Sequence, residues 1–192
     1  MKKKFTVLTS LIFIAITLTS SEQAGLLTLE DIYSKGIYRS QDFGPARWVD
    51  GGSGYTTLER SSSGGGADIV RYDTRTGVKS VIVAANELIP AGMDEPLMID
   101  DYSWSPDGRL MLVFTNTSRV WRYNTKGDYW VFDTVTRSLG QLGRTMPASS
   151  MMFAKFSPDG KSVAYVSNRN IYIDDLATSV TRQITFNGNS RI

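Results

Sequence analysis

The 192-residue chain contains neither histidine nor cysteine, so two of the commonest catalytic side chains are absent. A Ser-His-Asp triad therefore cannot be assembled from these residues, and thiolate chemistry is also excluded. The G-x-S-x-G pattern around a nucleophilic serine is missing as well, because Gly51–Tyr55 and Gly188–Ile192 both fail at its last position. We predict that this chain alone does not hydrolyse substrates through such a triad.

Two adjacent acidic pairs, Asp100–Asp101 and Asp174–Asp175, are the next candidates for acid–base or metal chemistry. Neighbouring side chains of an extended strand point to opposite faces, so the carboxylates of a pair would not converge. Turn structure is the favoured interpretation of both pairs. Because imidazole and a spaced carboxylate loop are both missing, we predict no metal site and no cofactor.

A binding role is better supported for segment 119–127, which reads Arg-Val-Trp-Arg-Tyr-Asn-Thr-Lys-Gly. An internal repeat aligns this segment with Ser167–Ile171, where far fewer residues make the same connection. Extra length at such a place lets a rigid scaffold project Trp121, Arg122 and Tyr123 from its surface. The alternative is structural, with the arginine stacked on the tryptophan or paired with a carboxylate.

The repeat also predicts the elements that hold this segment. Residues 101–116 align with residues 154–168, and each copy contains Ser-Pro-Asp-Gly, a sequence that favours a hairpin turn. A degenerate earlier copy begins at Arg47. Each copy is followed by an alternating apolar run that ends in an aspartate turn, at 68–77, 128–137 and 170–178. Each unit therefore has four expected strands.

Four-stranded units repeated at this spacing are typical of a β-propeller. The predicted fold class is all-β, a partial propeller over residues 46–192 with about three blades, at about 46–84, 101–143 and 153–186. Propellers usually close their ring with roughly four to eight blades. Three blades therefore lead us to expect that the chain is part of a larger protein.

The N-terminal residues predict export. Lys2–Lys4 precede the uncharged stretch Phe5–Thr19, so residues 1–21 are interpreted as a secretory signal peptide, with an uncleaved anchor as the alternative. Residues 22–45 form an N-terminal segment with a short helix at Thr28–Tyr33, capped by its first residue. We expect an exported protein that is periplasmic, held in the cell envelope or secreted.

Charge argues against a nucleic-acid partner. Without the three lysines of the signal peptide, 18 of the 21 basic residues remain against 19 acidic ones. A nucleic-acid-binding protein carries a basic patch, and none is visible in this sequence. The absence of cysteine means that disulfides do not contribute, so we expect stability to depend on core packing and strand pairing.

The order and spacing of these motifs resemble the N-terminal region of the dipeptidyl peptidase IV family, within the prolyl oligopeptidase clan. The resemblance runs from about residue 26 to the end of the chain. It rests on Leu27–Ile32, Tyr102–Gly108, Val120–Tyr123, Tyr129–Asp133, Phe156–Gly160, Ala164–Val166, Asn170–Tyr172 and Arg182–Thr185. It implies an eight-bladed propeller that covers an α/β-hydrolase domain, with the substrate held between them.

The resemblance also implies an activity and a site. Members of the family are serine exopeptidases that release X-Pro or X-Ala dipeptides from free N-termini, often as homodimers. Arg122 matches a family arginine that contacts the substrate's peptide carbonyl, a role suited to a planar and permanently charged guanidinium. Trp121 and Tyr123 are its neighbours. The family's paired glutamates and its catalytic triad are expected beyond Ile192, so this chain would gate and orient substrate without a catalytic domain.

Two other functions stay open from the sequence. The chain could be a noncatalytic propeller of the cell envelope that binds protein or peptide partners, or a propeller from another branch of the clan with a different substrate. A Glu-Glu pair soon after Ile192, with a later G-x-S-x-G, would favour the exopeptidase. A stop codon after a few more blades would favour the noncatalytic propeller.

Overall fold

The computed structural model describes residues 27–40 and 44–189. Residues up to Asp42 belong to one unit and residues from Phe43 onward to another. The predicted signal peptide, residues 1–21, lies outside the described residues. No helix within the described ranges is long and apolar enough to span a membrane. The domain limits predicted from the sequence stay predictions.

The short helix predicted in the first unit is present as η1, Glu30–Ser34. The backbone N–H of Asp31 donates to Thr28 Oγ1 at 3.1 Å, so the predicted threonine cap is also present. The Lys35 ammonium pairs with the carboxylate of Asp31 one turn earlier, at 2.9 Å. Both contacts stabilise the first turn of a helix that is too short to persist through its backbone hydrogen bonds alone.

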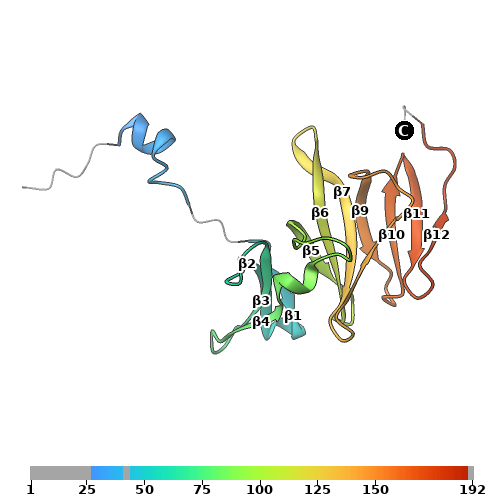
Figure 1. The fold of residues 1–192 in the computed structure, drawn as a ribbon, viewed down its shortest axis with the longest axis horizontal. Helices are drawn as coiled ribbons and strands as arrows, with labels where there is room; N and C mark the ends of the chain where they lie inside the picture. Colours follow the sequence, from blue (N-terminus) through green and yellow to red (C-terminus); the bar gives the residue numbers. More distant parts are fainter. Residues whose placement is uncertain (1–26, 41–43, 190–192) are drawn as a thin grey trace, which may run out of the picture. The chain divides into compact units, whose positions relative to one another are not determined.

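The second unit is built from three groups of four antiparallel strands, which lie side by side in chain order (Figure 1). The first group is β1 Arg47–Val49, β2 Gly54–Arg60, β3 Ala67–Asp73 and β4 Lys79–Val83. The second is β5 Ile99–Trp104, β6 Leu110–Val120, β7 Tyr123–Asp133 and β8 Ser138–Gln141. The third is β9 Met151–Phe156, β10 Ser162–Ser167, β11 Asn170–Asp175 and β12 Val180–Gln183. The predicted fold class, a partial β-propeller of about three blades, is confirmed.

Two short 3₁₀-helices join these strands: η2, Asp50–Gly52, follows β1, and η3, Ala85–Leu88, follows β4. The loop at residues 61–66 connects β2 to β3 within the first blade. The glycines of this loop, Gly64 to Gly66, all have positive φ, a conformation that other residues adopt only at a cost. The loop is therefore an ordinary hairpin connection of the blade.

The Ser-Pro-Asp-Gly turns have the same hydrogen bonds in both copies. Ser105 Oγ donates to Asp107 Oδ1 at 2.6 Å and accepts from the Leu110 N–H at 2.8 Å, while Gly108 takes φ = +71°. In the third blade, Ser157, Asp159, Gly160 and Ser162 repeat these contacts at 2.6 and 3.0 Å, with the glycine at φ = +69°. The motif therefore closes a hairpin, as its residues predict.

A second repeated turn ends the third strand of every blade. The carboxylates of Asp73, Asp133 and Asp175 each accept hydrogen bonds from the backbone N–H groups two and three residues later. This geometry is the Asx-turn, in which an aspartate side chain satisfies the backbone of its own turn. The three aspartate turns expected from the sequence repeat are therefore equivalent in the structure.

Two hydrophobic clusters lie between the blades. The first joins blades one and two and contains Ile69, Val83, Leu88, Tyr102, Met111, Val113 and Phe132. The second joins blades two and three and contains Leu112, Tyr129, Leu142, Met151, Ala154, Val163 and Tyr165. Because successive residues of β6 alternate between the two clusters, both faces of the middle blade are buried. This burial makes the middle blade a rigid base for whatever extends from it.

Candidate functional site

Strands β6 and β7 run beyond the body of the second blade and form a long hairpin, which we call the arm, residues 116–127. Their pairing continues as far as Val120 and Tyr123, and the hairpin is visible at one end of the blade in Figure 1. In the third blade, β10 and β11 are joined only by Asn168 and Arg169, both with positive φ, as in a tight two-residue hairpin turn. The extension predicted from the repeat is therefore present.

The tip of the arm exposes the three residues singled out from the sequence. The side chain of Trp121 is 83% exposed and that of Tyr123 is 73% exposed. The guanidinium carbon of Arg122 lies 4.4 Å from the centre of the Trp121 ring, within the range of a cation–π interaction. Two structural roles were open for this arginine, stacking on the tryptophan or pairing with a carboxylate. The stacking is present.

The other structural alternative, a carboxylate partner for Arg122, is not found. The ion pairs in the described part of the chain involve other residues. The backbone carbonyl of Arg122 accepts a 3.4 Å hydrogen bond from Arg119, which steadies the turn without using the guanidinium of Arg122. Stacking leaves the N–H donors at the edge of that guanidinium available to a ligand carbonyl or carboxylate.

The pairing of the two strands that form the arm is irregular. The register of β6 against β7 shifts between Thr115 and Ser118 and again between Ser118 and Arg119. Asn116 sits in the first of these shifts with φ = +48°. Extra residues of this kind bend a strand and re-aim the side chains beyond it. Both irregularities lie between the body of the blade and Arg122.

The base of the arm is tied to the third blade as well as to the second. Asp128 Oδ2 accepts a hydrogen bond from Asn116 Nδ2 at 2.6 Å, and its Oδ1 accepts one from the Ser149 N–H at 2.8 Å. Ser149 Oγ donates to the Asn116 carbonyl at 2.6 Å. In addition, Lys126 and Gly127 of β7 pair with β9. One edge of the arm thus belongs to the sheet of the next blade.

A small cavity of about 240 Å³ lies beside the base of the arm. It is lined by Asn124 and Thr125 of the arm and by Phe153 and Lys155 of β9, among other residues. Phe153 has φ = +58° and is 60% exposed, where the pairing of β9 with β10 is irregular.

The turn structure predicted for the first acidic pair is wrong. Asp100 and Asp101 lie in strand β5, where Asp101 accepts a 2.5 Å hydrogen bond from Arg47 of the first blade. The backbone pairing of β5 with β6 explains the difference, because Ile99 and Asp101 both pair with β6 and Asp100 lies in the irregularity between them. Asp101 therefore joins β5 to β1 of the first blade, and neither residue lies in a turn.

The prediction for the second pair is half correct. Asp175 ends β11 and caps its turn, whereas Asp174 is buried and accepts hydrogen bonds from the Gly143 N–H at 2.8 Å and from Tyr165 Oη at 2.9 Å. Burial, together with the charge and hydrogen bond of Asp174, raises the pKa of the Tyr165 hydroxyl, so this group stays protonated and donates. No group of three acidic side chains in the described residues could hold a metal ion.

Sequence reasoning missed Asn116, Asp128 and Ser149 as residues of the site. A signal for one of them was present, because Asp68 and Asp128 occupy the same position in the aligned repeat, five residues before the turn aspartate. Both carboxylates accept from the backbone of the connection to the next blade, Asp68 from the Ala85 N–H at 2.8 Å. The contact with Ser149 depends on tertiary structure that the sequence does not show.

Repeated four-stranded blades define the described part of this protein as a partial β-propeller. Residues 105–192, which include the whole arm, match the dipeptidyl peptidase IV (DPP IV) N-terminal region family. A crystal structure of Porphyromonas gingivalis dipeptidyl peptidase 4 superposes with a TM-score of 0.70 at 24% identity, over 85% of this chain and 22% of that one, which supports the fold. The resemblance to the DPP IV N-terminal region that the motifs predict is confirmed for residues 105–192.

Curated relatives carry related names. The probable dipeptidyl-aminopeptidase B of Arthroderma benhamiae is 28% identical over 152 residues, which cover 76% of this chain and 17% of that protein. Prolyl endopeptidase FAP of Homo sapiens is 30% identical over 164 residues, which cover 84% of this chain and 19% of that protein. The chain therefore spans less than a fifth of the length of these relatives.

Proposed function

We propose that this chain is the substrate-gating and substrate-orienting propeller of a DPP IV-like serine exopeptidase, which releases X-Pro or X-Ala dipeptides from peptides with a free N-terminus. The observation that carries the proposal is the arm, which presents Arg122 without a carboxylate partner in the described residues. The names of the relatives support the reaction class. Hydrolysis itself would come from an α/β-hydrolase domain of the same polypeptide, and the complete protein would form a homodimer.

Arg122 would act by donating hydrogen bonds to a backbone carbonyl of the bound peptide. Its guanidinium stays charged at any physiological pH, and charge-assisted hydrogen bonds are roughly twice as strong as neutral ones. The Trp121 ring holds the guanidinium plane, so less side-chain freedom is lost when the peptide binds. Trp121 and Tyr123 would add apolar contact on either side of the arginine.

The proposed location of this protein is outside the cytoplasm. The basic start and the uncharged stretch that follows support export, to the periplasm, the cell envelope or the medium. A substrate with a free N-terminus is available to an exported peptidase wherever proteins are degraded. Export and exopeptidase activity are therefore compatible proposals.

A second candidate is a noncatalytic envelope propeller that binds protein or peptide partners. The exposure of Trp121, Tyr123 and Val120 at a single hairpin tip favours it, because exposed apolar residues gathered at one place often mark a protein contact. This candidate predicts binding that does not depend on proline at the second position. The exopeptidase proposal predicts that proline or alanine at this position strengthens binding.

The test measures, by calorimetry, how tightly the whole chain binds an Ala-Pro pentapeptide and a matched Ala-Glu pentapeptide. Arg122→Ala should abolish binding of the first peptide while circular dichroism stays unchanged. Arg169→Ala is the matched control, because Arg169 occupies the equivalent hairpin turn in the third blade. Equal binding by wild type and Arg122→Ala would remove Arg122 from the site, and equal binding of both peptides would favour the noncatalytic propeller. A wild-type chain that binds neither peptide would contradict both.

A further inference from the structure

We propose that Asp128 is a positioning residue for the arm: its carboxylate, by joining Asn116 to Ser149, fixes the direction in which the arm carries Arg122. The functional meaning of this inference rests on the proposed function of Arg122. Its structural content does not, because it concerns how a hairpin is held. We call Asn116, Asp128 and Ser149 the clamp.

The arm needs such support because, apart from the pairing of Lys126 and Gly127 with β9, little else holds it. A two-stranded hairpin is marginally stable by itself in water, and this one is weakened by two irregularities in its pairing. Within the arm, Asn124 Nδ2 donates to Thr117 Oγ1 at 3.0 Å, but this contact is exposed and moves with the hairpin. The connection to the rest of the protein therefore depends on the base of the arm, where the clamp lies.

The clamp uses both oxygens of a buried carboxylate. Asp128 is 9% exposed, and each of its oxygens receives one donor, from Asn116 on one side and from Ser149 on the other. Asn116 and Ser149 both have a left-handed backbone, with φ of +48° and +53°, which asparagine tolerates better than most residues. Two strained residues held by one carboxylate form a specific geometry rather than a chance surface contact.

The position of Asp128 has an equivalent in each of the other two blades, and the contacts of the three residues differ. Asp68 in the first blade accepts from the Ala85 N–H, and Asn170 in the third accepts from the Gly188 N–H at 3.1 Å. Holding the segment that follows the blade is thus common to all three positions. Among the described residues, only Asp128 also accepts a side-chain amide from the strand that leads into an arm. The added contact occurs in the blade that has the added hairpin.

The clamp can be tested by moving its carboxylate from position 128 to position 116. In Asn116→Asp, two carboxylates face one another, so the arm should be released; aspartate tolerates the left-handed backbone at this position. In the double variant Asn116→Asp/Asp128→Asn, the new amide at 128 can donate to the new carboxylate and still accept from the Ser149 N–H. This double variant should restore the arm, which a general loss of stability would not allow.

Limited trypsin digestion of the whole chain measures release of the arm. The rate of cleavage after Arg122 is divided by the rate after Arg169, which lies in the tight turn of the third blade and serves as an internal reference. This ratio should rise about tenfold in Asn116→Asp, the effect expected from losing a hydrogen bond to a charged group and gaining repulsion. It should return to the wild-type ratio in the double variant and stay at that ratio in the control Asp68→Asn.

Each other result contradicts the proposal. An unchanged ratio in Asn116→Asp would show that the clamp does not hold the arm, and an equal rise in Asp68→Asn would show that the effect is not specific to it. If Asn116→Asp does not fold, Ser149→Ala removes only the hydroxyl that donates to Asn116, and the ratio should still rise; no rise overturns the proposal. Peptide binding is then compared in the same variants. Asn116→Asp should weaken it only when Arg122 is present, and a wild type that binds no peptide would refute the proposed function while leaving the digestion result valid.

Discussion

The hydroxyl of Tyr102 in the second blade donates a hydrogen bond to Thr56 Oγ1 in the first blade, at 2.8 Å. Trp104 Nε1 donates to the same oxygen at 2.9 Å. Thr56 is fully buried and Tyr102 almost so. Burial raises the pKa of the Tyr102 hydroxyl, so this group remains a donor at all physiological pH values. A single threonine oxygen thus joins two aromatic side chains across the boundary between blades.

Thr56→Val should destabilise the protein although it keeps the shape of the side chain. The change removes the shared acceptor and leaves Tyr102 Oη and Trp104 Nε1 without this partner. Each buried polar group that loses its hydrogen bond costs about 1–3 kcal/mol, so we expect a decrease of this order in the free energy of unfolding. Urea denaturation of the whole chain measures it.

Thr57→Val is the control for this prediction. Thr57 is also buried, but its Oγ1 has no hydrogen-bond partner in the described structure. Replacing an unsatisfied hydroxyl by a methyl group should leave the free energy of unfolding unchanged or raise it by about 1 kcal/mol. If both valine variants lost the same stability, the hydrogen bonds of Thr56 would not be the cause.

Gly127 is required by close packing at the base of the arm. A Cβ atom at this position would lie 2.5 Å from Phe114 Cε2 and 2.7 Å from the Thr115 carbonyl oxygen. Gly127→Ala should therefore lower the free energy of unfolding by about 1–3 kcal/mol, the usual cost of overpacking. Gly140→Ala in β8 is matched, because a Cβ there meets nothing within 4 Å, and thermal unfolding should shift little. Equal shifts for both alanine variants would contradict the packing argument.

The propeller was predictable because its turns are local. Ser105–Gly108 and the turn that begins at Asp133 satisfy their own backbone within a few residues, so the same residue types appear in each copy. The extension that carries Arg122 was predictable for the same reason, as a difference in length between aligned turns. The contacts of Asp174 and Asp128 were not predictable, because they reach Gly143 and Ser149, whose positions depend on how one blade packs on the next.

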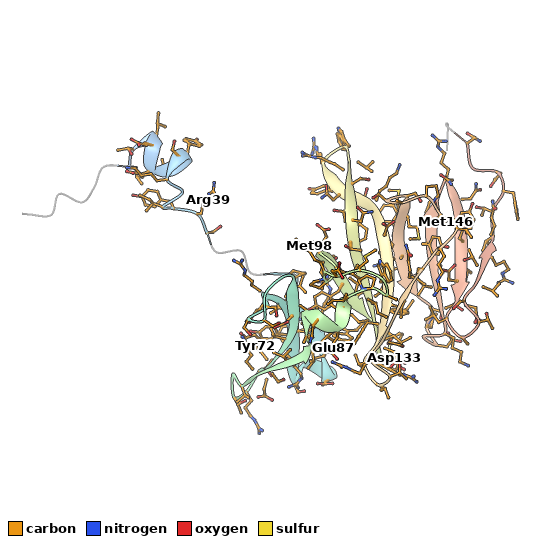
Figure 2. The ribbon with its side chains drawn as sticks, in the orientation of Figure 1. Arg39, Tyr72, Glu87, Met98, Asp133 and Met146 are labelled. Carbon is orange, nitrogen blue, oxygen red and sulfur yellow. The ribbon has the colours of Figure 1, made fainter. Side chains whose placement is uncertain are left out.

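Arg137 joins the second blade to the connection that leaves the first. Its Nε donates to Glu87 Oε1 at 2.6 Å, its two terminal nitrogens donate to the Ile82 carbonyl at 3.1 Å, and its guanidinium lies 5.1 Å from the Phe132 ring centre. Glu87 is labelled on the connection after β4 in Figure 2.

Arg137→Lys keeps the charge but loses the planar fork that makes these contacts together. We expect the free energy of unfolding to fall by about 1 kcal/mol, the typical net value of a lost hydrogen bond. Arg144→Lys, at an exposed arginine, is the control and should change little. Urea denaturation at low and high salt distinguishes the fork from simple charge, since only a charge effect would vanish at high salt.

The aspartates that cap the turns of the blades have lowered pKa values, which determine how the stability of the protein changes in acid. Arg109 binds both oxygens of Asp133, at 2.6 and 3.2 Å, and this contact, with the Val135 and Thr136 N–H groups, holds the pKa of Asp133 well below its usual range. Backbone hydrogen bonds from Thr76 and Thr178 lower the pKa values of Asp73 and Asp175 in the same way. Asp133 lies at the end of β7 opposite to the arm (Figure 2).

A carboxyl group whose pKa is lowered by folding stabilises the folded state fully above its unfolded pKa, about 4 for aspartate, and this contribution is lost as the pH falls through the lower folded value. The thermal midpoint should therefore be constant from about pH 7 to about pH 5 and fall below about pH 4. Asp133→Asn removes one titrating group. Below about pH 4, the thermal midpoint of this variant should therefore fall less than that of the wild type. Asp94→Asn, in an exposed loop, should keep the wild-type acid response. An identical acid response in Asp133→Asn and wild type would mean that the contact between Arg109 and Asp133 does not stabilise the folded state in solution.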